Sequence, residues 1–174
     1  IWQCGSISLD LSKPHIMGIL NVTPDSFSDG GLHNNVEQAI KHALQMIQDG
    51  ATVIDVGGES TRPGASIVEV EEEIRRVVPV VTALSKYDVV ISIDTSEPRV
   101  IREAVKAGAH IWNDVRALTR PNALETAAEL NIPVIIMHMR GEPTTMNGLD
   151  QYYDVVVDVM SELQQRVDDA IDAG

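Results

Sequence analysis

The 174-residue sequence is poor in the features that mark several classes of protein. Its single cysteine, Cys4, excludes an internal disulfide, and the cytoplasm is therefore the expected location. Its apolar runs, such as 133–137, fall far short of the roughly 18 residues of a membrane span, and we recognise no secretory leader. With 13 basic against 26 acidic side chains, the sequence does not suit nucleic-acid binding.

Aromatic residues are also scarce, at 3% of the chain, whereas 44% of its residues are hydrophobic. The core must therefore be built from aliphatic side chains, and there are enough of them for one domain. No linker, low-complexity tract or block of like charge divides the sequence, so we interpret residues 1–174 as a single domain.

Short β-branched runs alternate with segments whose apolar residues recur at helical spacing, a pattern typical of βα units on a parallel sheet. The runs are nearly continuous in apolar residues, as buried parallel strands require. The predicted strands are His15–Leu20, Thr52–Val56, Val89–Ile93, His110–Trp112 and Pro133–Met137. The predicted fold class is therefore α/β.

The intervening segments predict helices whose negative charge lies mainly on outer, solvated faces. The first two predicted helices cover 36–47 and 67–84, and the third and fourth begin near 96–98 and 121. The fifth begins at about 150, and its apolar residues between 156 and 171 share one face. In the second helix, Glu71 and Glu72 each precede an arginine by four residues, the spacing of a helical ion pair. Residues 1–13 predict a small hairpin that covers one end of the sheet.

Ligands of parallel α/β folds lie at the carboxyl ends of the strands, so the residues that follow each strand are the candidates. The first strand runs into the polar, turn-rich segment 21–31, which holds the single phenylalanine, Phe27. The carbonyl of Asn21 can orient a phosphate or a hard cation. The segment is therefore either a lid over a ligand or a surface loop of turn-forming residues.

The second strand ends in residues 55–64 (DVGGESTRPG), which have the composition of an anion site. Glycines let the backbone approach a ligand, hydroxyls donate to phosphate oxygens, and the guanidinium of Arg62 suits a phosphate. The alternative is a glycine-rich turn with a solvated arginine. Neither a Walker A motif nor a dinucleotide fingerprint is present.

The third, fourth and fifth strands end at Asp94, Asn113 and Met137–His138. A carboxylate and a carboxamide on neighbouring strands can recognise a heterocycle that presents both donors and acceptors. Taken singly, Asp94 could cap the next helix and Asn113 could bond the backbone, while a lone His138 is more often structural than catalytic. A zinc site is not indicated, because the cysteine and histidines lack ligand spacing.

Two long motifs, Met17–Gly31 (MGILNVTPDSFSDGG) and Asp55–Gly64, closely resemble dihydropteroate synthases of the bacterial folate pathway. Residues 93–95, 113–114 and 137–139 extend the resemblance over essentially the whole chain. It implies a (β/α)8 TIM barrel, a single pterin-binding domain of which this chain supplies about the first five βα units.

The resemblance also implies an activity, that of a transferase which joins p-aminobenzoate to 6-hydroxymethyl-7,8-dihydropterin diphosphate, releasing diphosphate and forming 7,8-dihydropteroate. By the family pattern, Asp94 and Asn113 hold the pterin, and Met137 contributes to the pocket wall. The resemblance also implies that magnesium assists the reaction.

The family pattern places the diphosphate beside Asn21, Thr61 and Arg62, and Asn21 also meets the metal. In the implied mechanism the carbon–oxygen bond breaks first, and the arylamine then attacks a resonance-stabilised pterin cation. Arg62 and Mg²⁺ stabilise the charge of the leaving group, while Asp29 stabilises the cation.

Phe27 and Pro63 match positions that wall the p-aminobenzoate pocket, where the family distinguishes its substrate from sulfonamide inhibitors. The implied partners are these small molecules, with no nucleic acid and no membrane, and the parent enzyme is expected to be a homodimer.

The chain departs from the family in its length, because an eight-stranded barrel needs roughly 250 residues. The later family segments, which complete the pterin pocket, are absent, and we therefore expect these 174 residues to be inactive alone. A five-stranded arc would also expose two sheet edges and an apolar inner face. A pterin-dependent methyltransferase barrel and a catalytically inactive half-barrel are the alternative interpretations.

Overall fold

The computed structural model describes residues 1–22, 31–58, 68–142 and 145–174, and its central element is a parallel sheet. The sheet follows chain order, so each strand pairs with the next one along the sequence, as successive strands of a (β/α)8 barrel do. Its strands are β3 (Ile16–Asn21), β4 (Ala51–Gly57), β5 (Val90–Asp94), β6 (Ile111–Asp114) and β7 (Val134–Ile136). The strand predictions are therefore confirmed to within two residues at each end, and the α/β class with them.

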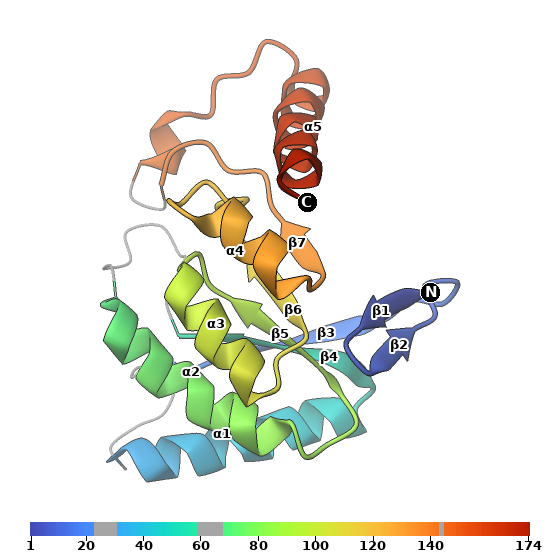
Figure 1. Cartoon of the computed structure of the whole chain (residues 1–174), viewed down its shortest axis with the longest axis vertical. Coiled ribbons are helices and arrows are strands. Elements are labelled where there is room, and N and C mark those ends of the chain that lie inside the picture. Colours follow the sequence, from blue (N-terminus) through green and yellow to red (C-terminus); the bar gives the residue numbers. More distant parts are fainter. Residues whose placement is uncertain (23–30, 59–67, 143–144) are drawn as a thin grey trace.

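Four helices cover one face of this sheet (Figure 1). They are α1 (Gly31–Gln48), α2 (Val70–Leu84), α3 (Pro98–Ala107) and α4 (Ala123–Leu130). Alternate strand residues, among them Ile54, Ile91 and Trp112, are fully buried in the aliphatic core beneath these helices. The remaining strand residues therefore point to the opposite, inner face, since successive side chains of a strand alternate in direction.

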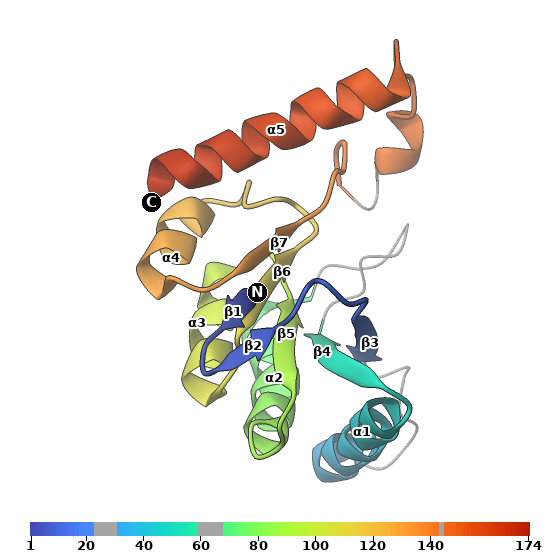
Figure 2. The same cartoon turned by 90° about the vertical axis from the view of Figure 1, so that its right-hand side faces the viewer.

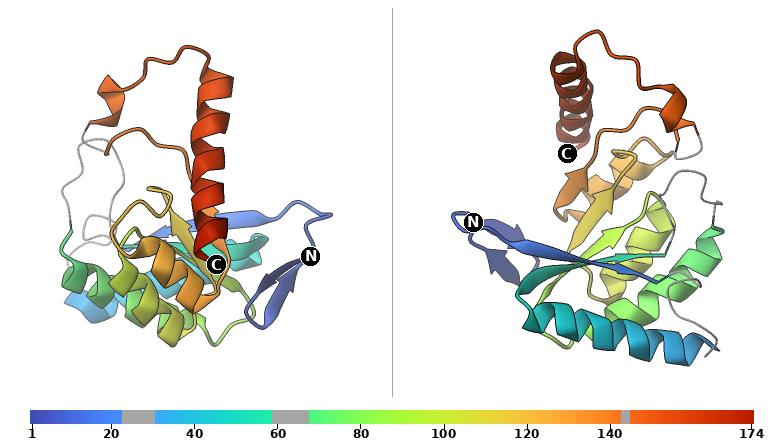
Figure 3. Two further views of the ribbon diagram at one scale, coloured as in Figure 1. Left: turned by 45° about the horizontal axis from the view of Figure 1, so that its top comes forward. Right: turned by 180° about the vertical axis from the view of Figure 1, so that it is seen from behind.

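A hairpin of β1 (Trp2–Cys4) and β2 (Ile7–Leu9) packs on that inner face. Cys4 and Leu9 form a second apolar cluster with Val53, Val90 and Ile111. Figure 3 shows the hairpin on the side of the sheet that lies away from α1–α4. The predicted hairpin is thus confirmed, and because it meets the early part of the strands it leaves their carboxyl ends uncovered.

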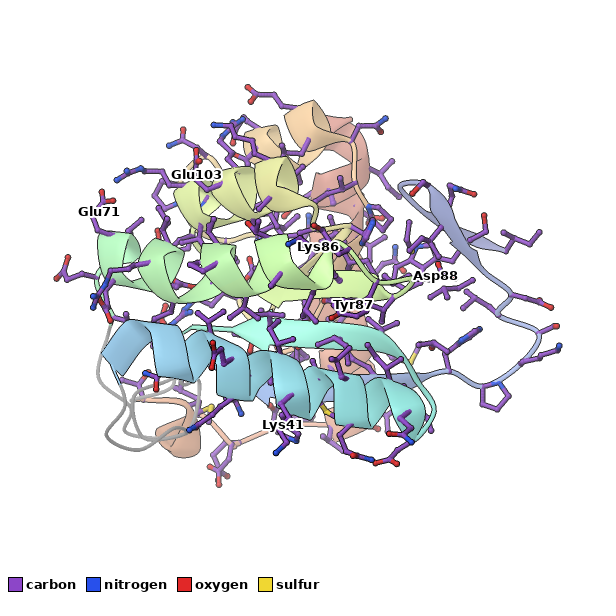
Figure 4. The ribbon with its side chains drawn as sticks, turned by 90° about the horizontal axis from the view of Figure 1, so that it is seen from below. Lys41, Glu71, Lys86, Tyr87, Asp88 and Glu103 are labelled. Atoms are coloured by element: carbon purple, nitrogen blue, oxygen red, sulfur yellow. The ribbon has the colours of Figure 1, made fainter. Side chains whose placement is uncertain are left out.

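The outer helix faces carry the charge, as expected from the sequence. Lys41 of α1, Glu71 of α2 and Glu103 of α3 point away from the sheet when the molecule is seen from below (Figure 4). Glu72 pairs with Arg76 as predicted, with 2.7 Å between Oε1 and Nε.

The last helix, α5 (Val155–Ala173), lies beside α4 across the end of the molecule (Figure 2). It begins five residues later than predicted, because the Asp154 carboxylate caps it by accepting from the N–H groups of Val156 and Val157. None of the residues in α5 is buried, and Met160 and Ile171 are 66% and 68% exposed. Its predicted apolar stripe exists but packs against little of the described chain.

The two edges of the sheet are β3 and β7, as expected for an open arc. Ile19, on the inner face of β3, is 64% exposed. Among the helices that the structure describes, none is both long and apolar enough to cross a membrane.

Candidate functional site

The predicted site residues at the strand ends fall in one row on the inner face of the sheet. Asn21 pairs with Gly57, Gly57 with Asp94, and Asp94 with Asn113 across successive parallel strands. Met137 follows β7, whose Ile135 is paired with Asn113. The sequence prediction that these side chains gather at one edge is therefore confirmed for Asn21, Asp94 and Asn113, and Met137 lies one strand further along.

Gly57 is buried directly beside Asp94 in this row. A Cβ placed on Gly57 would lie 3.4 Å from Cβ and Oδ2 of Asp94, so a larger side chain would press against that carboxylate. A glycine at this position therefore avoids a side-chain contact with the carboxylate of Asp94.

The loop after Asp94 is held by the strand beside it. Thr95 donates its N–H to the carbonyl of Asn113 at 3.2 Å, and its own carbonyl accepts from Nε1 of the buried Trp112 at 2.7 Å. Ser96 is not the side-chain cap of the next helix, because its hydroxyl donates instead to the buried carboxylate of Asp114 at 2.5 Å. These bonds hold the backbone that follows Asp94 against β6.

A buried polar cluster lies beneath Asn113. Nδ2 of Asn113 donates to Oδ2 of Asp55 at 3.0 Å, and the hydroxyl of Ser92 donates to Oδ1 of Asp55 at 2.6 Å. Asp55 is 5% exposed, and this burial raises the pKa of its carboxyl. The hydrogen bonds from Ser92 and Asn113 lower the pKa, but by less than burial raises it. Asn113 therefore bonds a side chain rather than the backbone, in contrast to one interpretation of the sequence.

No individual role for Asp55 or Ser92 is predicted above, although the sequence holds a signal for both. Each is a polar residue within an otherwise apolar strand, in the segments TVIDV and VVISI. A charged residue in the middle of a buried strand requires a partner, so the two positions could have been linked across neighbouring strands.

Beyond β7, His138 has a structural environment, as its sequence context favoured. Its Nε2 lies 2.7 Å from Oε2 of Glu162 on α5, and Arg140 also binds that carboxylate. These two partners lower the pKa of Glu162 to about 2, with the Arg140 hydrogen bond as the main cause. His138 thus joins the end of β7 to α5.

A cavity of about 260 Å³ lies between residues 116–119, 137–139 and α5. Met137 lines it, whereas Asn21, Asp94 and Asn113 do not. This cavity is therefore distinct from the row of strand-end residues, on which the site rests.

The other predicted site residues, Phe27, Asp29, Thr61, Arg62 and Pro63, lie outside the residues that the structure describes. Their predicted roles remain predictions. Over residues 1–22, 31–58, 68–142 and 145–174, no three His, Cys, Asp or Glu side chains are grouped so as to hold a metal ion.

A model of the pterin binding enzyme family matches residues 17–174, which include all of the parallel sheet except Ile16 and every predicted site residue. The chain therefore belongs to the family of pterin-binding enzymes. Within this family it is similar to dihydropteroate synthases: it is 63% identical over 153 residues to the enzyme of Escherichia coli strain K12, covering 87% of this chain and 54% of the relative. The chain thus spans about half the length of the curated relative.

Solved structures give the same result. The dihydropteroate synthase of Yersinia pestis in complex with a sulfonamide drug aligns with a TM-score of 0.92 and 52% identity, over 99% of this chain and 63% of that one. The Xanthomonas albilineans enzyme with 4-aminobenzoic acid aligns with a TM-score of 0.87 and 48% identity, over 96% of this chain and 59% of that one. The five βα units thus adopt the fold of these enzymes.

Proposed function

We propose that the full-length protein carrying this chain is a dihydropteroate synthase. It joins the amine of p-aminobenzoate to 6-hydroxymethyl-7,8-dihydropterin diphosphate, forming a carbon–nitrogen bond and releasing diphosphate. The observation that carries the proposal is the row of Asn21, Asp94 and Asn113 on the inner face at the carboxyl ends of β3, β5 and β6. The similarity to curated dihydropteroate synthases supports it.

In this proposal, Asp94 and Asn113 bind the pterin through its donor and acceptor edge. A carboxylate accepts hydrogen bonds, and a carboxamide both accepts and donates, so the pair matches a ring that carries N–H groups beside acceptor nitrogens. Met137, which is 43% exposed, adds an apolar contact at the side of the pocket.

The diphosphate binds beside Asn21, where Thr61 and Arg62 supply a hydroxyl and a planar guanidinium. Mg²⁺ fits this donor set, because it keeps several waters and takes one or two protein oxygens together with substrate phosphates. The amide oxygen of Asn21, whose side chain is exposed at the row, would hold it. When bound, the ion supplies positive charge to the departing diphosphate.

The proposed reaction begins with cleavage of the carbon–oxygen bond, whose electron pair leaves with the diphosphate. Arg62 stabilises this negative charge and the carboxylate of Asp29 stabilises the pterin cation that remains. The amine of p-aminobenzoate attacks the exocyclic carbon of the cation and then loses a proton. Phe27 and Pro63 wall the arylamine site, where sulfonamides compete.

We further propose that the protein acts in the cytoplasm and as a homodimer. A pterin-dependent methyltransferase would need neither the diphosphate segment around Arg62 nor an arylamine pocket, so that alternative is not favoured. The alternative of an inactive half-barrel is tested by the activity of the full-length protein.

The Arg62→Ala variant of the full-length protein tests the diphosphate assignment. Loss of a charge-assisted hydrogen bond predicts a fall of about 10- to 100-fold in kcat/KM for the pterin diphosphate. The measurement is dihydropteroate formation at a fixed concentration of p-aminobenzoate.

The matched control is Arg75→Ala, since Arg75 lies on α2 with a side chain that is 58% exposed and bound to Glu72. This variant should keep the activity of the unmodified protein. Equal kcat/KM values for the Arg62→Ala and unmodified proteins would remove Arg62 from the proposed site.

A further inference from the structure

The carboxylate of Asp55 lies directly beneath the row of strand-end residues. Asp55 pairs with Ser92 across β4 and β5, and Asp94 follows Ser92 by two residues on the same face of β5. Asn113, the partner of Asp94 on β6, reaches down from the row to this carboxylate. The strands β4, β5 and β6 lie side by side (Figure 1), and the hydrogen bonds among Asp55, Ser92 and Asn113 join them in one polar cluster.

Both oxygens of this carboxylate are occupied by donors. The hydroxyl of Ser92 lies 2.6 Å from Oδ1 and Nδ2 of Asn113 lies 3.0 Å from Oδ2. Asp55 is 5% exposed and Ser92 is fully buried, so water competes little for these bonds. A buried carboxylate is strongly destabilised when it loses its donors, and the cluster therefore holds its partners firmly.

The carboxylate also selects one of two orientations of the Asn113 side chain. The two ends of a carboxamide have almost the same shape, but one donates and the other accepts. In the structure the amino end of Asn113 donates to Asp55, and an ionised carboxylate, which only accepts, favours this orientation. The carbonyl oxygen of Asn113 is then left for another partner.

We propose that Asp55 is a positioning residue, which orients the carboxamide of Asn113 so that an acceptor oxygen faces the pterin. This inference rests on the proposed function, because it gives Asn113 a pterin ligand. Asp55 itself does not touch the ligand. A side chain at position 55 that cannot accept a hydrogen bond would let the carboxamide turn, and a donor would then oppose the N–H groups of the ring.

The first test measures the binding of 6-hydroxymethylpterin to the full-length protein by calorimetry. Asp55→Ala should raise Kd by about tenfold or more, the effect of a lost hydrogen bond to a charged group. Asp55→Asn should restore Kd to within about threefold, because the new amide can accept from Asn113 while donating to Ser92. Ser92→Ala, which leaves the bond from Asn113 to Asp55 in place, should have a smaller effect than Asp55→Ala.

A positioning role predicts this rescue, whereas a role for the negative charge itself would make Asp55→Asn as weak as Asp55→Ala. Equal Kd values for Asp55→Ala and the unmodified protein, or no rescue in Asp55→Asn, would overturn the inference. If the unmodified protein did not bind the pterin at all, the proposed function would fail instead.

A second measurement needs no variant at position 55 and decides the case in which Asp55→Ala does not fold. Nitrogen-15 NMR of the unmodified protein reports the hydrogen exchange of each asparagine side-chain NH2 group. The NH2 group of Asn113 should be protected relative to that of the exposed Asn122, with and without pterin. Exchange as fast as that of Asn122 would contradict the orientation, whatever the binding data show.

Discussion

Replacement of Trp112 by phenylalanine should destabilise the protein at the point where the core supports the site. Trp112 is fully buried on the helix side of β6, and its indole N–H donates to the carbonyl of Thr95 at 2.7 Å. Phenylalanine fills most of the same space but has no donor. The substitution therefore separates this hydrogen bond from the bulk of the ring.

The expected loss has two parts. Removing the donor from a buried carbonyl should cost about 1–3 kcal/mol, since Thr95 is only 2% exposed and water reaches it poorly. The ring also loses two carbon atoms, which at about 0.8 kcal/mol per buried group adds about 1.5 kcal/mol. The free energy of unfolding should fall by about 2.5–4.5 kcal/mol.

Urea unfolding of the full-length protein, followed by circular dichroism, measures this difference. Trp2→Phe is the matched control, because Trp2 is the other tryptophan and lies half-buried in the hairpin. It should lower the free energy of unfolding by less than about 1.5 kcal/mol. A loss below about 0.5 kcal/mol for Trp112→Phe, or one equal to that of Trp2→Phe, would refute this view of how the loop after Asp94 is held.

Two further predictions concern stability and pH. Gly108→Ala should lower the free energy of unfolding, measured in urea, by about 2–5 kcal/mol, because Gly108 has φ +114° and an added Cβ would lie 2.7 Å from Cβ of Ser85. Gly50→Ala is the control for backbone strain alone, since Gly50 has φ +111° and an added Cβ would meet no described atom within 4 Å. Equal losses in the two variants would rule out the contact with Ser85. The carboxyl of Glu162 should titrate by NMR at about 2 rather than at its ordinary 4.5, and Arg140→Gln should return it toward 4.5. Because the pKa of Glu162 is lowered in the folded state, its ion pair stabilises the folded protein fully above pH 4.5, and this stabilisation is lost as pH falls toward 2. A titration midpoint of Glu162 near 4.5 in the unmodified protein would contradict this prediction.

Much of the fold could be predicted from the sequence, because its pattern is local. The apolar runs locate each strand to within two residues, and the polar residue after each run locates the edge where Asn21, Asp94 and Asn113 meet. The first turn of α3 could also be placed, since Pro98 starts it. These features depend on periodicity and on residues that start or stop elements.

Contacts between residues distant in sequence could not be predicted. Glu71 does not pair with Arg75, four residues later, but with Arg99 on α3, at 2.7 Å between Oε1 and Nη1. Asp55 and Asn113 are separated by 58 residues, and only the pairing of three strands brings them together. Helical periodicity likewise shows that α5 has an apolar face but not what packs against it.

The most direct test of the proposed activity is the reaction of the full-length protein with 6-hydroxymethyl-7,8-dihydropterin diphosphate and p-aminobenzoate in the presence of Mg²⁺. Liquid chromatography with mass detection would follow 7,8-dihydropteroate, and a coupled assay would follow diphosphate. We expect equal amounts of the two products, with inhibition by a sulfonamide that p-aminobenzoate relieves. Release of diphosphate without dihydropteroate, or no turnover by a folded full-length protein, would contradict it.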